Sequence, residues 1–152
     1  MFGSCRRAFA EYVCASAKAL ALKPENVTFA QAASAPLAAF TALQGLRDKG
    51  KIQAEHRVLV NGAAGGVGTL AVQIAKAFDA DVTGVCSTRN LEHVRSIGAD
   101  RVVDYTREDF AGDGQRYDLI FDLVGNRSLP AFRRILKPKG ITSEREGRPI
   151  RG

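Results

Sequence analysis

The chain has 152 residues, of which 45% are hydrophobic and 25% charged, which is ordinary for about one globular domain with a real core. Its formal charge of +6 would suit a polyanion, but the basic residues are scattered, so no nucleic-acid partner is expected. Nothing approaches 18 consecutive apolar residues, so no membrane partner is expected either. The three cysteines lack C-x-x-C spacing, which favours a reducing cytoplasmic location over a disulfide framework or a zinc knuckle.

The first part of the chain predicts an extended segment followed by two helices. Residues 8–24 are expected to be extended, with Tyr12 and Val13 favouring a strand. This segment is too short to be a domain, yet it resembles the end of one. Thr28 to Gln31 has the spacing of a capping box and predicts the start of a short helix. Pro36 predicts a second helix, whose apolar side would hold Leu37, Phe40, Leu43 and Leu46.

A glycine-rich turn lies between a predicted strand and a predicted helix. Val58 to Val60 forms an apolar run without alternation, which is typical of a strand buried on both faces. Four glycines follow within seven residues, at positions 62, 65, 66 and 68. The next residues carry the apolar stripe of a helix, at Val67, Leu70, Ala71, Ile74, Ala75 and Phe78.

Strand, glycine turn and helix in this order predict the phosphate-binding corner of a dinucleotide fold. In the G-x-G-x-x-G register the first glycine is replaced by Ala63. We expect the pyrophosphate of a nucleotide to lie against the backbone of Ala64, Gly65, Gly66 and Val67, where the helix dipole favours negative charge. The alternative is a tight turn that uses glycine only for packing.

The rest of the chain alternates strands with helices, which predicts an α/β fold with a doubly wound parallel (Rossmann) sheet in the strand order 3-2-1-4. A fifth strand is expected to begin near Gly140 and to fail, because residues 144–149 are charged and rich in breakers. The predicted elements after the glycine turn are strands at 81–86, 101–104 and 117–124, a helix between Asn90 and Gly98, and a helix from Ser128 that Pro138 to Gly140 would stop.

The end of the second strand bears on the choice of nucleotide. An NAD-preferring site usually places a carboxylate there for the ribose 2′-OH. Here Cys86 occupies that position, followed by Ser87, Thr88 and Arg89. Without a carboxylate a 2′-phosphate is not repelled, and hydroxyls with a guanidinium could bind it. We therefore expect NADPH in preference to NADH, the alternative being a solvated loop in which Arg89 only leads into the next helix.

Five ordered motifs resemble the medium-chain dehydrogenase/reductase superfamily, and in particular its zinc-independent quinone oxidoreductase branch. The resemblance covers about residues 9–140. The motifs are Phe9-Ala10-Glu11-Tyr12-Val13, Pro36-Leu37-Ala38-Ala39-Phe40-Thr41-Ala42, Ala63-Ala64-Gly65-Gly66-Val67-Gly68, Ile97-Gly98-Ala99-Asp100 and Phe121-Asp122-Leu123-Val124-Gly125.

This resemblance implies roles for further residues. Tyr105 matches a tyrosine that packs near the adenosine, although an exposed loop position is the alternative. Thr41 matches a threonine on the nicotinamide side, although it could equally be a helix-interior residue. Val124 and Gly125 end a strand at the carboxyl edge of the sheet, where open α/β sheets bind ligands. Leu37 takes the place of a zinc-ligating cysteine and cannot coordinate the metal, so no metal site is expected.

The resemblance also implies a domain organisation and an activity. Residues 1–24 would be a remnant of the GroES-like catalytic domain, 25–140 the nucleotide-binding domain, and 141–152 an irregular tail of an internal fragment. The expected function is an NADPH-dependent oxidoreductase that passes hydride to a quinone or an α,β-unsaturated carbonyl, with its substrate-contacting residues outside this chain. Alternatives are a zinc-independent alcohol dehydrogenase-like enzyme and a non-catalytic nucleotide-binding module, whose free sheet edge could form a homodimer.

Overall fold

The computed structural model describes residues 1–3, 5, 8, 10–112, 114–144 and 150–151. The chain forms two compact units, Met1–Phe40 and Thr41–Gly152. The elements are β1 (Phe2–Gly3), β2 (Leu20–Ala21), α1 (Phe29–Leu43), β3 (Arg57–Asn61), α2 (Gly66–Ala77), β4 (Asp81–Cys86), α3 (Leu91–Ser96), β5 (Arg101–Asp104), β6 (Tyr117–Asp122), α4 (Leu129–Ile135), β7 (Leu136–Glu144) and β8 (Ile150–Arg151). Three short helical segments join them, at Ala17–Ala19, Gln44–Lys49 and Thr88–Asn90.

The first unit holds a two-stranded antiparallel sheet, in which β1 pairs with β2. The predicted strand at Tyr12 and Val13 is wrong, because neither residue belongs to a strand. Tyr12 is 91% exposed. Strand propensity depends on packing against neighbouring strands, and the exposed Tyr12 side chain has no such packing.

Helix α1 begins as the sequence predicts. The Gln31 backbone N–H donates to Oγ1 of Thr28 at 3.2 Å, and the Thr28 N–H donates to Oε1 of Gln31 at 2.8 Å, which is a reciprocal capping box. The second helix predicted at Pro36 is wrong, since Pro36 lies inside the continuous helix. A helix that is already nucleated can lose one backbone hydrogen bond at a proline and continue.

The helical segment Gln44–Lys49 continues α1 as a π-helical turn that packs on the sheet. The Gly50 N–H donates to the carbonyl oxygen of Gly45 at 2.9 Å. A Cβ on Gly45 would lie 2.5 Å from the ring of Phe121, so only glycine allows this close approach of backbone to β6.

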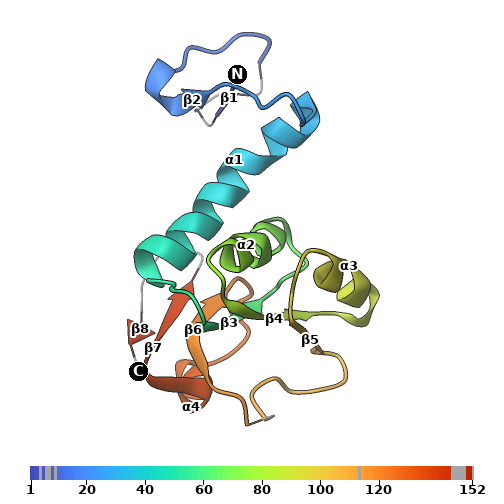
Figure 1. The fold of residues 1–152 in the computed structure, drawn as a ribbon, viewed down its shortest axis with the longest axis vertical. Helices are drawn as coiled ribbons and strands as arrows, with labels where there is room; N and C mark the ends of the chain where they lie inside the picture. The colour runs from blue at the N-terminus through green and yellow to red at the C-terminus, as the bar shows by residue number, and fades with distance from the viewer. Residues whose placement is uncertain (4, 6–7, 9, 113, 145–149, 152) are drawn as a thin grey trace. The chain divides into compact units, whose positions relative to one another are not determined.

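The second unit is built on a six-stranded sheet in the order β5-β4-β3-β6-β7-β8. The first five of these strands are parallel, which confirms the predicted α/β doubly wound sheet and its 3-2-1-4 order. Figure 1 shows α2 and α3 together on one side of the sheet and α4 on the other. Apolar residues of the strands are buried on both faces, as crossover helices require.

The prediction that the fifth strand fails is wrong for the described residues. Strand β7 runs parallel to β6, with Ile141 opposite Leu119 and Ser143 opposite Phe121. The strand begins at Leu136, so α4 ends before the proline that was expected to stop it. The pairing register shifts between Tyr117 and Leu119, and this irregularity accommodates the proline.

The predicted tail lies largely outside the described residues, at 145–149 and 152. Ile150 and Arg151 form β8, which pairs antiparallel with β7 at Thr142 and Ile141. Strand β6 therefore has β7 beside it and is not the free sheet edge on which the homodimer expectation relied. The fourth strand also ends at Asp122, two residues before its predicted end.

Candidate functional site

The turn between β3 and α2 has glycine at positions 62, 65, 66 and 68, and the physical reason for glycine differs among these positions. Gly62 has a φ of +90°, which favours glycine, and its carbonyl accepts from the Gly65 N–H at 3.1 Å. A Cβ on Gly68 would lie 2.1 Å from the Gly62 oxygen, so Gly68 serves helix–strand packing. A Cβ on Gly66 would meet nothing within 4 Å, and one on Gly65 would lie no closer than 3.4 Å to the Gly62 oxygen. Packing does not require glycine at 65 or 66.

Ala63 replaces the first fingerprint glycine without obstructing the turn. Its side chain is fully buried, and a Cβ placed on Gly84 of β4 would lie 3.1 Å from the Ala63 methyl. The same Cβ would lie 2.6 Å from Val94 of α3. The methyl group thus packs into space left by Gly84, in the core rather than in the turn's open side.

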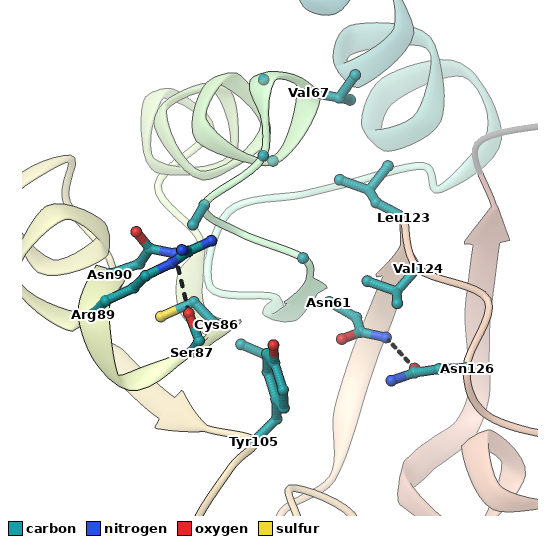
Figure 2. A pocket seen from close by; sticks show the side chains of 16 residues that line it. Asn61, Val67, Cys86, Ser87, Arg89, Asn90, Tyr105, Leu123, Val124 and Asn126 are labelled. Carbon is teal, nitrogen blue, oxygen red and sulfur yellow. Dashed lines mark hydrogen bonds between the residues drawn. The ribbon is translucent and has the colours of Figure 1, made fainter.

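The turn forms one wall of a pocket of about 580 Å³ at the carboxyl edge of the sheet (Figure 2). The carboxyl ends of β3, β4 and β6 supply the other walls, which is the topological switch point of an open α/β sheet. The structure brings eight predicted site residues together in its lining: Ala64, Gly65, Gly66, Val67, Ser87, Arg89, Tyr105 and Val124.

Arg89 and Ser87 lie on the same side of the pocket, at the end of β4 (Figure 2). Oγ of Ser87 accepts from Nδ2 of Asn90 at 3.2 Å, which fixes the hydroxyl oxygen beside the helix start. Arg89 has no carboxylate partner within the described part of the chain. Its guanidinium is thus available to an anion in the pocket.

Thr88 differs from its two neighbours, because it does not line the pocket. Its Oγ1 donates to Oδ2 of Asp104 at 2.5 Å and lies 3.0 Å from Oγ1 of Thr106. The expectation that the Thr88 hydroxyl is available to a phosphate is therefore corrected, because this hydroxyl donates its hydrogen bond to the buried carboxylate of Asp104 on β5.

Cys86 lines the pocket where an NAD-preferring site would carry a carboxylate. Burial raises the pKa of its thiol, and the negative charge of Asp104 raises it further. The thiol is therefore neutral at physiological pH. No Asp or Glu is among the described residues that line the pocket.

On the β6 side of the pocket, Asn61, Asp122 and Asn126 are joined by hydrogen bonds that the sequence did not predict. Nδ2 of Asn61 donates to Oδ1 of Asp122 at 2.8 Å. It also donates to Oδ1 of Asn126 at 3.0 Å, and this second bond is drawn in Figure 2. The same Asp122 oxygen accepts from the N–H groups of Val124 and Gly125 at 3.1 and 3.2 Å. Asp122 thus has a structural role. A polar residue ending an apolar buried strand, as Asn61 does, was the signal available.

Two predicted residues, Gly125 and Thr41, do not line the pocket, and a third, Tyr105, lines it only in part. Gly125 is not among the pocket-lining residues, and its φ of +71° and its N–H bond to Asp122 give it a role in the turn. Thr41 lies within α1 and does not line the pocket. Tyr105 lines the pocket and is 56% exposed, so its ring faces both pocket and solvent. Their binding roles stay predictions.

Within the described ranges, the side chains that could bind a metal ion are not clustered. The described residues contain no group of three or more His, Cys, Asp or Glu that could hold a metal ion. His56 lies just before β3, where its Nδ1 accepts from the Gln53 N–H at 3.3 Å. Leu37, in the position where the zinc-dependent branch carries cysteine, is an aliphatic residue within α1.

The model of one protein family, zinc-binding dehydrogenase, matches residues 66–143. The chain belongs to this family. It falls in the quinone oxidoreductase-like branch of the medium-chain dehydrogenase/reductase superfamily, which confirms the prediction from its motifs. The matched residues run from the first turn of α2 to β7 and include Ser87, Arg89, Tyr105 and Val124.

Relatives within this dehydrogenase family agree with that branch. The chain is 44% identical over 126 residues to 2-methylene-furan-3-one reductase of Solanum lycopersicum. It is 46% identical over 126 residues to the chloroplastic NADPH-dependent alkenal/one oxidoreductase of Arabidopsis thaliana. Each alignment covers 82% of this chain and 31% of the relative.

A solved quinone oxidoreductase from Coxiella burnetii has a similar fold, with a TM-score of 0.80 at 38% identity. The alignment covers 89% of this chain and 43% of that chain. This chain therefore spans about a third of the length of the curated relatives and under half of the solved structure. Within the part of the chain that the structure describes, no helix has the length and apolar character needed to cross a membrane.

Proposed function

We propose that the chain is the nucleotide-binding part of an NADPH-dependent reductase of the quinone oxidoreductase type. The observation that carries this proposal is the pocket at the switch point, where the open glycine turn faces Ser87 and Arg89 and no described lining residue is acidic. Two relatives support the chemistry, one named an NADPH-dependent alkenal/one oxidoreductase and the other a 2-methylene-furan-3-one reductase.

The residues present fit a dinucleotide. Gly65 and Gly66 leave the turn open, and helix α2 begins there, so a pyrophosphate can accept from its first N–H groups. The adenosine half would extend toward Ser87, Arg89 and Tyr105 on the β4 side. The nicotinamide half would extend toward Val124 on the β6 side, because such folds bind the two halves across the switch point.

Within this arrangement Arg89 is proposed to bind the 2′-phosphate. A guanidinium is always protonated at physiological pH and donates in a geometry that matches phosphate oxygens. Ser87 adds an oxygen and a hydroxyl proton at the same side of the pocket. Cys86, which holds the place of the ribose-binding carboxylate, carries no charge that would repel the phosphate.

The nicotinamide group supplies the hydride when it is bound. The role of this chain's own residues is to bind the nucleotide, orient it and shield one side of it from water. The proposed acceptors are a quinone or an α,β-unsaturated carbonyl, both of which accept hydride at an electron-poor carbon or oxygen. We name no catalytic residue, because the substrate-contacting groups of the parent are proposed to lie outside residues 1–152.

Two calorimetric titrations test the cofactor assignment. The chain should bind NADPH at least tenfold more tightly than NADH, and Arg89→Ala should remove most of that difference while leaving NADH binding within about twofold. Arg133→Ala is the matched control, since Arg133 is an exposed residue of α4 that does not line the pocket. Equal affinities for both nucleotides in the parent chain would contradict the NADPH assignment.

A turnover assay separates binding from catalysis. The purified chain should oxidise NADPH little or not at all with a quinone or an enone, because it spans only 31% of its reductase relatives. Robust turnover by the chain alone would show that the catalytic groups lie within it. Binding without turnover is the result that the proposal expects.

The remaining expectations concern the parent protein. We infer that residues 1–24 belong to its catalytic domain and residues 25–140 to its nucleotide domain, although compactness divides this chain after Phe40. A homodimer and a cytoplasmic location stay predictions, the latter from three cysteines that are free of disulfide bonds. The alcohol dehydrogenase-like alternative is less favoured, because the relatives' names include quinone and enone-type reductases.

A further inference from the structure

The carboxylate of Asp104, on the neighbouring strand β5, lies beside the carboxyl end of β4. Asp104 is the last residue of β5 and pairs in parallel register with Cys86. Asp104 is only 5% exposed, and its charge reaches Cys86 strongly enough to raise the pKa of that thiol. The fold therefore places the carboxylate of Asp104 next to Cys86, although the carboxyl end of β4 carries no acidic residue.

This carboxylate is turned toward hydrogen-bond donors outside the pocket. Oδ2 accepts from Oγ1 of Thr88 at 2.5 Å. Oδ1 accepts from Oγ1 of Thr106 at 2.7 Å and from its backbone N–H at 3.0 Å. Nε of Arg107 lies 3.7 Å from Oδ2. Each carboxylate oxygen thus has donors, and neither Asp104 nor Thr88 lines the pocket that their neighbours Cys86, Ser87, Arg89 and Tyr105 line.

We propose that Thr88 is a specificity-determining positioning residue, whose hydroxyl holds the Asp104 carboxylate away from the pocket and so permits a 2′-phosphate beside Arg89. This inference rests on the proposed function, which places the 2′-phosphate at Arg89. It goes beyond the proposed function by assigning the preference to two residues that do not line the pocket, Thr88 and Asp104.

Removing the Thr88 hydroxyl takes away the hydrogen-bond donor of Oδ2 of Asp104. Of the contacts named above, Oδ2 then keeps only Nε of Arg107 at 3.7 Å, which is too far for a hydrogen bond. A buried acidic oxygen without a hydrogen-bond donor is costly, so it seeks another one. The 2′-OH of an unphosphorylated ribose is such a donor, and a carboxylate at this edge of the sheet is the usual acceptor for it. A 2′-phosphate offers no suitable proton and is repelled by the negative charge.

A hydroxyl that merely stabilised the turn would behave differently. Its loss would loosen the segment that carries Arg89 whatever the charge at position 104, and neutralising Asp104 would not repair it. The proposal instead requires that the effect of removing the hydroxyl depend on the charge of Asp104. A double-variant comparison separates these two possibilities.

The experiment titrates the 152-residue chain with NADPH and with NADH by calorimetry. Thr88→Val should reduce the NADPH-to-NADH preference about tenfold, chiefly through weaker NADPH binding. Thr88→Ser keeps the hydroxyl and should keep the preference. The double variant Thr88→Val with Asp104→Asn should return the preference to within about threefold of the parent value, because the repelling charge is gone. Ser96→Ala, which removes a hydroxyl bonded to the His93 carbonyl on α3, is the control.

The outcomes separate this inference from the proposed function. If the parent chain binds neither nucleotide, both fail. If the parent prefers NADPH and Thr88→Val keeps that preference, only the inference is overturned. It is also overturned if the double variant remains as impaired as Thr88→Val, or if circular dichroism shows that Thr88→Val alone is unfolded, since either result gives the hydroxyl a structural role.

Discussion

Asn61 and Asp122 face each other in register at the carboxyl ends of the adjacent parallel strands β3 and β6, and their side chains are joined by a 2.8 Å hydrogen bond. Both residues are almost fully buried. The bond therefore ties the two central strands together at the point where their chains part to form the pocket. It also fixes the loop after β6, since the same Asp122 oxygen accepts from the N–H groups of Val124 and Gly125.

Replacing Asp122 by alanine should destabilise the chain by about 3 kcal/mol, because a buried amide and two backbone N–H groups would lose their acceptor. Urea denaturation followed by circular dichroism measures this loss. Glu92→Ala removes a carboxylate whose side chain is 95% exposed, so its cost should stay within about 0.5 kcal/mol. A loss below about 1 kcal/mol for Asp122→Ala would mean that this network does not hold the strand ends together.

Substitution by alanine should destabilise the chain much more at Gly68 than at Gly66. Gly68→Ala should cost about 3 kcal/mol or more in stability, because the new methyl group would lie 2.1 Å from the Gly62 carbonyl oxygen. Gly66→Ala should change stability by less than about 1 kcal/mol, since its methyl group meets nothing within 4 Å. Denaturant titration of both variants makes this comparison.

Gly66→Ala should nevertheless weaken NADPH binding about tenfold or more, because its methyl group would occupy the open side of the turn that a phosphate approaches. Calorimetric titration of this stable variant isolates the effect. Unchanged NADPH affinity would show that the pyrophosphate does not lie against the first turn of α2.

Acid should weaken the fold partly through Asp118. Burial acts to raise the pKa of this carboxyl, but the Lys137 ammonium at 2.7 Å and the Arg57 N–H at 2.9 Å outweigh it and lower the pKa. A folded-state pKa below the unfolded value means that the unfolded chain binds the proton more readily. The stabilisation is therefore complete above the ordinary Asp range and is lost as pH falls below about 4.

Asp118→Asn should accordingly be less stable than the parent at pH 7 and should lose less stability between about pH 5 and 2.5. Urea midpoints measured across this range test the expectation. Parallel curves for the two chains would assign the acid sensitivity to other carboxyls, of which Asp100 beside Lys76 is one with a lowered pKa.

The thiol of Cys86 should react slowly with iodoacetamide at pH 8, because burial and the charge of Asp104 raise its pKa and the thiolate is the reactive form. Cys14 is exposed and serves as the internal comparison. NADPH should slow the Cys86 reaction further, since Cys86 lines the proposed nucleotide pocket. Peptide mass spectrometry of a timed reaction reads both sites. Equal rates at Cys86 with and without saturating NADPH would place the nucleotide elsewhere.

Local sequence patterns determined the second unit's central elements and the glycine turn. Apolar runs predicted the three strands between Arg57 and Asp104, because a parallel strand is buried on both faces. The capping box of Thr28 and Gln31 predicted the start of α1, because its hydrogen bonds join residues three positions apart. Such signals depend on residues a few positions apart. Together with the family resemblance, they also predicted eight residues of the candidate site, which lie in the turns after β3, β4, β5 and β6 or in the helical turns that follow them.

Contacts between distant segments decided the rest. Pro36 remains inside a helix, and the strand after Leu136 passes a proline, because the backbone around each makes bonds that the local sequence does not show. The hydrogen bonds of Thr88 with Asp104 and of Asn61 with Asp122 join residues of different elements that are far apart in the sequence, so neither bond was visible along the chain. By itself the sequence determined where a nucleotide pocket should form; only the tertiary structure decided which polar groups line it and which are held away, since hydrogen bonding depends on distances that folding sets.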